Sequence, residues 1–261
     1  MHNELSRRDL VRFAATGGLV VCGSVLAGGA AAQQERERQG DSRRRVAEAG
    51  EGEGEKEVTA SEDLMREHGV LRRTLIVYRE AAERLRSERG RVDAAALRNG
   101  AQLFRRFGEE YHERMLEEQY IFPAVIKIEG GGDLSRLVDV LLRQHMRGRE
   151  ITDYILGVTH GGSIAPADAQ PLATAMENLA RMYEAHTARE DTVLFPAWKN
   201  ALSADDYHEM GERFEEIEHR VFGEDGFKDA AQRIARVEQS LDLFDLQTFT
   251  APAPPTAEAK A

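Results

Sequence analysis

Apolar residues recur at intervals of three or four from about residue 60 to about residue 245, which is the spacing of amphipathic helices. The first run follows Ser61, a suitable N-terminal cap, and ends before Gly90. Its apolar positions are Leu64, Val70, Leu71, Leu75 and Tyr78. The pattern therefore predicts a helix over about residues 61–89.

Three further runs have the same period and are separated by short segments that contain glycine. They predict helices over about residues 93–128, with Asp93 as the cap, 133–160 and 166–201. Two shorter runs within residues 204–243 predict additional helices. Long helices joined by short loops are typical of antiparallel bundles. We therefore expect an all-α fold, an antiparallel four-helix up-down bundle with extra C-terminal helices.

The first 32 residues have the features of an export signal. Arg7 and Arg8 precede an apolar run over residues 13–27, which is too short to span a membrane comfortably, and an A-x-A type cleavage site follows at residues 30–32. The paired arginines resemble the motif of the twin-arginine pathway, which exports folded proteins. We expect residues 1–32 to be a twin-arginine signal peptide read by the twin-arginine export machinery. The mature protein is then expected to be periplasmic or extracellular and not membrane-spanning.

The other domain boundaries follow from changes in composition. Residues 33–59 are rich in Glu, Arg, Gly and Gln, and they cannot bury enough apolar surface to offset the entropy lost on ordering. We expect a disordered acidic linker there, and the bundle over residues 60–201. A C-terminal helical extension is expected over residues 202–245, and a disordered Pro-rich tail over residues 246–261.

Charge and cysteine content exclude several classes of function. The net charge is −11, and an acidic protein repels nucleic acid phosphates, so we expect no nucleic acid partner. The single cysteine, Cys22, lies in the apolar N-terminal run. The helical region therefore offers no thiolate ligand and no cysteine nucleophile. A metal ion bound there would be held by nitrogen and oxygen.

Four of the eight histidines are distributed one to each main predicted helix, at His68, His112, His145 and His186. The second and the fourth open similar segments that end in Phe-Pro, at residues 112–123 and 186–196. The separations within the two halves are also alike, 44 residues from the first histidine to the second and 41 from the third to the fourth. The pattern indicates an internal duplication. One histidine alone is typical of a core or surface residue, but four in register favour a metal site.

Each duplicated segment also supplies a glutamate. His186 and Glu190 are four residues apart, about 40° around an α-helix, so their side chains face the same way. His112 and Glu117 are five residues apart, about 140° around a regular α-helix, and they share a face only if a single-turn π-bulge intervenes. Glu113, four residues before Glu117, remains a second candidate ligand.

Four imidazoles and two carboxylates suit divalent iron, manganese or zinc, and the carboxylates can bridge two ions. Burial of six such groups without a cation would be costly, which disfavours a purely structural bundle. A ferritin-like oxidase would need Glu-x-x-His on two helices, and only Glu109 with His112 fits that spacing. The residues therefore favour a site for two ions.

This arrangement resembles hemerythrin-like (HHE cation-binding) proteins, whose hallmark is a lone histidine on helices one and three and a histidine followed by glutamate and Phe-Pro on helices two and four. The resemblance covers about residues 60–200. It implies two non-haem iron ions that meet a small ligand such as O2, NO or peroxide. The metal ligands that it implies are His68, His112, Glu117, His145, His186 and Glu190.

One position departs from the oxygen-carrying members of that family. They have a second histidine on helix three, four residues after the first, where this chain has Arg149. An open coordination position favours reaction with oxygen, peroxide or nitric oxide over reversible oxygen carriage. Iron storage or sensing without turnover, and a scavenging enzyme, both stay open. His219 is an alternative ligand, and Tyr111 and Tyr183 either tune the site or fill the core.

Overall fold

The structure, a computed structural model, describes residues 58–87, 92–223 and 225–254. The predicted signal peptide, most of the predicted linker and the end of the predicted tail lie outside the described residues. Within the described part, all regular secondary structure is helical, which confirms the all-α class. None of the described helices combines the length and the apolar character needed to cross a membrane.

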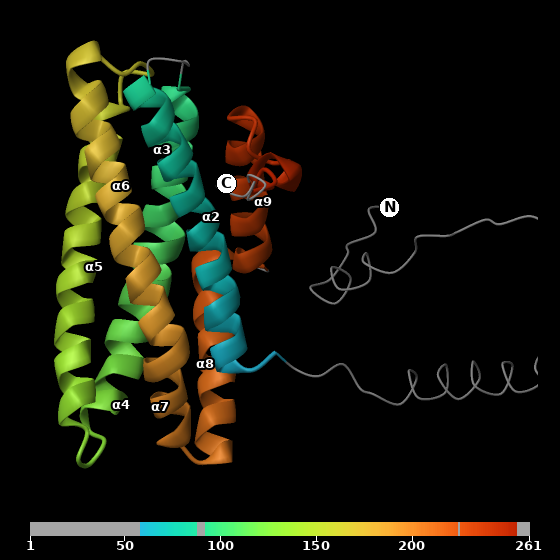
Figure 1. The fold of residues 1–261 in the computed structure, drawn as a ribbon. Coiled ribbons are helices and arrows are strands. Elements are labelled where there is room, and N and C mark those ends of the chain that lie inside the picture. The colour runs from blue at the N-terminus through green and yellow to red at the C-terminus, as the bar shows by residue number, and fades with distance from the viewer. Residues whose placement is uncertain (1–57, 88–91, 224, 255–261) are drawn as a thin grey trace, which may run out of the picture. The chain divides into compact units, whose positions relative to one another are not determined.

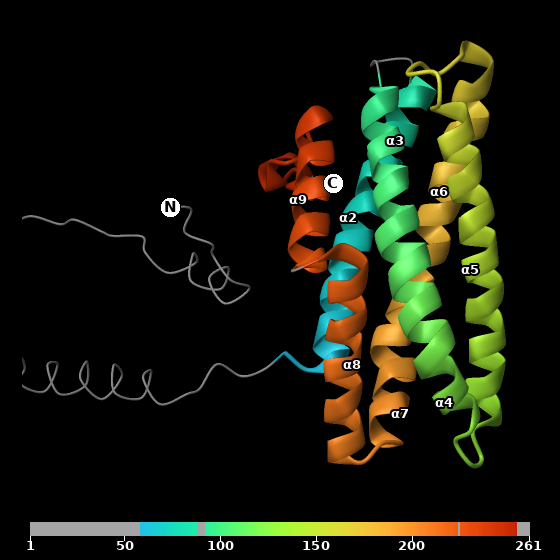
Figure 2. The same ribbon diagram turned by 180° about the vertical axis from the view of Figure 1, so that it is seen from behind.

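Long helical segments, here called rods, lie side by side (Figure 1 and Figure 2). The second and the fourth rod each contain a π-helical stretch between two α-helical stretches. The first rod is α2 (Ala60–Ser87), and the third is α5 (Gly132–Val158). The second rod consists of α3 (Ala94–Leu103), the π-helix η2 (Phe104–Ile121) and α4 (Phe122–Ile126). The fourth consists of α6 (Pro166–Arg189), the π-helix η3 (Glu190–Leu194) and α7 (Phe195–Asn200).

The start of α2 differs from the sequence-based expectation. Thr59, not Ser61, caps the helix, because the Glu62 carboxylate accepts from the Thr59 N–H at 3.0 Å and the Thr59 hydroxyl faces the Glu62 N–H at 3.4 Å. Ser61 lies inside the helix, and its hydroxyl accepts from Tyr207 at 2.8 Å. The expected cap at Asp93 is confirmed, since its carboxylate accepts from the Ala95 N–H at 2.8 Å.

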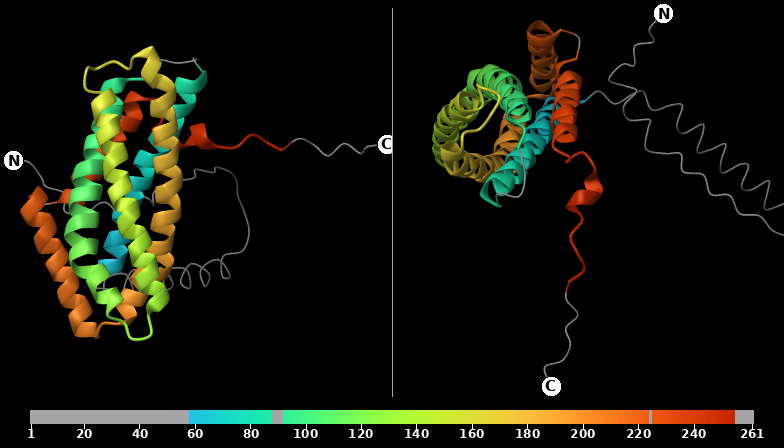
Figure 3. Two further views of the ribbon diagram at one scale, coloured as in Figure 1. Left: turned by 90° about the vertical axis from the view of Figure 1, so that its left-hand side faces the viewer. Right: turned by 90° about the horizontal axis from the view of Figure 1, so that it is seen from above.

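The C-terminal part forms α8 (Ala204–Phe222), α9 (Gly226–Ser240) and the short 3-10 helix η4 (Leu246–Phe249). α8 packs against α2 and η2, while α9 packs against α2 and α3, so both lie on one side of the rods (Figure 3). Near the junction of α7 and α8, the Trp198 ring lies 5.5 Å from the Tyr207 ring and 5.8 Å from the Phe214 ring. These buried aromatic contacts hold α8 in place.

Apolar side chains from all four rods form the core, and a layer of polar side chains interrupts it. Burial of ionisable groups is costly unless they are paired or bind a cation. The buried histidines and glutamates of this layer come from α2, η2, α5, α6 and η3, and they are Glu67, His68, Glu109, His112, Glu113, Glu117, His145, His186 and Glu190. This layer is the candidate functional site.

Candidate metal centre

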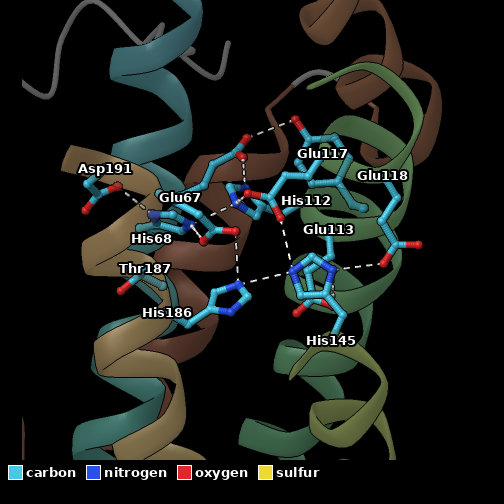
Figure 4. A network of polar contacts seen from close by, with 12 residues as sticks. Glu67, His68, His112, Glu113, Glu117, Glu118, His145, His186, Thr187 and Asp191 are labelled. Carbon is cyan, nitrogen blue, oxygen red and sulfur yellow. Dashed lines mark hydrogen bonds and ion pairs between the residues drawn. The ribbon is translucent and has the colours of Figure 1, made fainter. Parts of the chain in front are cut away.

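The four histidines singled out from the sequence meet inside the rods with their Nε2 atoms facing one another (Figure 4). His68 on α2 and His112 on η2 form one pair, with their Nε2 atoms 2.9 Å apart. His145 on α5 and His186 on α6 form the other, with their Nε2 atoms 3.1 Å apart. We call these the His68 pair and the His145 pair. Each histidine is at most 2% exposed.

The π-helix η2 brings Glu117 onto the same side as His112. At its end the Phe122 N–H donates to the Glu117 carbonyl, five residues back, so that residues five apart stack along the axis. The His112 Nε2 lies 3.4 Å from the Glu117 Oε1 as a result. The expected single π turn is in fact an 18-residue π-helix. η3 has the same π-helical hydrogen bond, since the Phe195 N–H donates to the Glu190 carbonyl, five residues back.

Glu117 and Glu190 each reach both histidine pairs. The Glu117 oxygens lie 3.4 Å from the Nε2 of His112 and 3.4 Å from that of His145. The Glu190 oxygens lie 3.0 Å from the Nε2 of His186 and 3.5 Å from that of His68. All four carboxylate oxygens are buried and lack a hydrogen-bond partner. Such atoms are rare in folded proteins, and a bound cation would satisfy them.

The electrostatics of most of these groups also suit a cation. His112 differs, because burial lowers its pKa but the neighbouring Glu117 and Glu67 outweigh burial and raise it. Burial lowers the pKa of His68 to about 3 and that of His186 to about 4, so both imidazoles are neutral and able to coordinate. Burial raises the pKa of Glu190 to about 8 and raises the pKa of Glu117 as well. A metal ion stabilises the ionised carboxylates that burial alone disfavours.

All six residues implied by the family resemblance therefore converge. We call them the six-residue cluster: His68, His112, Glu117, His145, His186 and Glu190. One ligand atom from each of Glu117, His145, His186 and Glu190 lies within 4.8 Å of the others, and the same holds for His68, His112 and Glu117. The residues present, imidazoles and carboxylates, fit a metal cation.

Each Nδ1 atom, on the outer side of its ring, faces an oxygen acceptor. The partners are Asp191 for His68 at 2.7 Å, Glu67 for His112 at 2.6 Å, Glu118 for His145 at 2.9 Å and Gln144 for His186 at 2.9 Å. Such contacts fix the ring and leave Nε2 free to bind a metal. The sequence analysis missed these four residues. Their positions in the sequence could have indicated them, because each is the direct neighbour of a cluster residue in the chain.

The Phe-Pro motifs close the site. The Phe195 ring stacks on His68 with ring centroids 5.5 Å apart, and the Phe122 ring stacks on His145 at 5.5 Å. Each phenylalanine covers the lone histidine of the other half. Both rings are at most 2% exposed, so they keep water away from the imidazoles.

Glu113, the second candidate ligand from the sequence, lies on the outer side of His145, where ligand atoms of Glu113, Glu118 and His145 lie within 4.8 Å of one another. Its Oε1 accepts from the Tyr183 hydroxyl at 2.5 Å, and its Oε2 lies 3.0 Å from the Arg149 guanidinium. Tyr111 likewise donates to Glu67 at 2.9 Å. Both tyrosines thus contact carboxylates at the edge of the site in addition to filling the core.

Arg149 lies on the outer side of His145. Its guanidinium donates to Glu118 at 2.5 Å, and Glu118 in turn contacts the His145 Nδ1, so the positive charge does not point toward the Nε2 atoms. His219 is exposed on α8 and is not part of the site. Glu109 accepts from Thr152 at 2.6 Å, so it does not fill the ligand role that a ferritin-like oxidase needs.

Comparisons with known proteins agree with this geometry. The family profile described as the hemerythrin HHE cation binding domain matches residues 59–198. Uncharacterized proteins of Mycobacterium bovis and of Mycobacterium tuberculosis are each 47% identical to the chain over 199 residues, which is 76% of the chain and 76% of the relative. No solved structure matches the chain significantly.

Proposed function

Because the chain belongs to the hemerythrin HHE cation-binding family, we propose that the six-residue cluster binds two non-haem iron ions inside an antiparallel four-helix up-down bundle. The observation that carries the proposal is the set of four buried, unpartnered oxygens of Glu117 and Glu190, which lie between two pairs of Nε2 atoms. An unsatisfied buried oxygen costs about 1–3 kcal/mol, and two cations would satisfy all four.

The residues that would hold the two ions fall into two sets. Glu117, His145, His186 and Glu190 would hold one ion, and His68, His112 and Glu117 would hold the other. Glu190 also lies 3.5 Å from the His68 Nε2. Each ion would thus have three or four protein ligands, and iron accepts further ligands beyond four.

We infer from this ligand count that the centre binds or reacts with a small molecule such as O2, NO or H2O2. Iron supplies the Lewis acid and redox chemistry for such a ligand. The protein contributes a water-poor site in which the stacked Phe122 and Phe195 rings shield the imidazoles. A protein that only stores or senses iron would bind the same ions without turnover.

We also propose that the chain is exported by the twin-arginine machinery and works outside the cytoplasm. The support is Arg7 and Arg8 ahead of an apolar run and an A-x-A sequence. Replacement of both arginines by lysine should leave the protein in the cytoplasm, and unchanged export would refute this part of the proposal.

The decisive experiment measures the iron content and the optical spectrum of the full chain, first reduced without oxygen and then exposed to air. Two irons per chain with a reversible spectral change would indicate oxygen binding, and irreversible oxidation or peroxide consumption would indicate turnover. His112→Ala and His186→Ala should each lose iron. His160→Ala, an exposed histidine in the loop after α5, is the matched control and should retain it. Full iron in the first two variants would overturn the proposal.

A further inference from the structure

The two halves of the site repeat the same contacts around their Nδ1 atoms. His68 is followed four residues later by Arg72, and His145 is followed four residues later by Arg149. Arg72 pairs with Asp191, which contacts the His68 Nδ1. Arg149 pairs with Glu118, which contacts the His145 Nδ1. The lone histidines of the two halves thus have equivalent surroundings, each facing a carboxylate whose charge is shared with an arginine.

The other two histidines differ. The residue just before His68 is Glu67, whose Oε2 lies 2.6 Å from the His112 Nδ1. The equivalent residue just before His145 is Gln144, whose Oε1 lies 2.9 Å from the His186 Nδ1. One imidazole therefore donates to a carboxylate and the other to a neutral amide. Glu67 is 1% exposed, and low polarity around it strengthens its hydrogen bond.

No neighbouring group restores equality at His186. Glu113 is a further carboxylate in that half, but it lies 3.8 Å from the His145 Nδ1 and is engaged by Tyr183 and Arg149. In the first half, the Tyr111 hydroxyl donates to Glu67, and one carboxylate oxygen is left for His112. The contrast between Glu67 and Gln144 therefore stands.

We propose that the two metal positions are unequal, with Glu67 and Gln144 as the positioning residues that set their order. The position at the His68 pair binds a divalent cation more tightly and fills first. A carboxylate acceptor makes the imidazole a stronger donor through Nε2 than an amide acceptor does. Changes in such partners alter metal affinity about 10- to 100-fold, and we expect a difference of that order between the positions. This inference rests on the proposed metal-binding function.

The test is a titration of the metal-free full chain with Co²⁺, followed by calorimetry and by the visible spectrum. The wild-type protein should bind in two steps. His186→Ala disables the position at the His145 pair, and its remaining ion should bind about 10- to 100-fold more tightly than the ion that remains in His112→Ala.

The sharper test exchanges the two positioning residues. Glu67→Gln combined with Gln144→Glu should reverse the affinity order of the two positions, which a merely structural role would not do. The single variants Glu67→Gln and Gln144→Glu keep the shape of the side chain. Their metal affinities can therefore be measured even if a histidine variant fails to fold. Glu67→Gln should weaken the tighter step, and Gln144→Glu should strengthen the weaker one.

The outcomes separate this inference from the proposed function. Two ions of equal affinity in the wild-type protein, or an order that survives the exchange, would overturn the inference and leave the metal centre intact. Failure of the wild-type protein to bind Co²⁺ would overturn both.

Discussion

Glu190 tests the physical basis of the site most directly, because its removal should act in opposite directions with and without metal. Both of its oxygens are buried without a hydrogen-bond partner, and burial raises its pKa to about 8, so the metal-free protein buries a carboxyl group that no hydrogen bond stabilises. Methionine has a similar length and no polar oxygen. Glu190→Met should therefore stabilise the metal-free protein while weakening the metal-bound one.

The magnitude follows from the two oxygens. Each buried unsatisfied group costs about 1–3 kcal/mol, so their removal should raise the free energy of unfolding of the metal-free protein by about 2 kcal/mol or more. In the metal-bound form, the variant loses a shared ligand. A ligand present at 100 times its Kd stabilises the folded state by about 2.7 kcal/mol, and most of that gain should disappear.

The assay is urea unfolding followed by circular dichroism, with a chelator in one series and excess Co²⁺ in the other. Glu218→Met is the matched control, because Glu218 is equally buried but accepts from the Phe227 N–H at 2.7 Å. The control should lose about 1–3 kcal/mol in both series. If Glu190→Met destabilises the metal-free protein as Glu218→Met does, the oxygens of Glu190 are satisfied without a cation and the reasoning fails.

Two further predictions concern pH and packing. Burial raises the pKa of Glu190 from an unfolded value of 4.5 to about 8, so the metal-free protein is most stable below pH 4.5, where this carboxyl is protonated, and it loses stability as the pH rises to about 8 and the buried carboxyl ionises. Metal binding needs the ionised form, so the gap in Tm between metal-bound and metal-free protein should widen across this window, and a constant gap would contradict the prediction. Gly148→Ala would place a Cβ atom 2.3 Å from the hydroxyl of Tyr183 and should cost about 1–3 kcal/mol in urea unfolding. Gly157→Ala, on the same helix with no neighbour within 4 Å, should be neutral or stabilising, and equal costs for both would refute the packing argument.

The sequence by itself determined the helical class and the residues of the cluster. Helical periodicity is a local property, so the runs of apolar residues predicted the helical segments that the structure contains. The duplicated His-Glu-Phe-Pro segments predicted which side chains would meet. The five-residue spacing between His112 and Glu117 left two alternatives open, a π-bulge or Glu113 as the ligand, because no regular α-helix places residues five apart on one face, and the structure has the π-helix.

Only the tertiary structure decided which outer group meets which imidazole. Asp191 and His68 are 123 residues apart, and their contact depends on how η3 and α2 are rotated against each other. The same packing turned Glu113 toward Tyr183 and left His219 exposed, although the sequence had made both candidate ligands. Helical spacing defines the face of one helix, but the partner of that face is set by packing between helices, which no local pattern encodes.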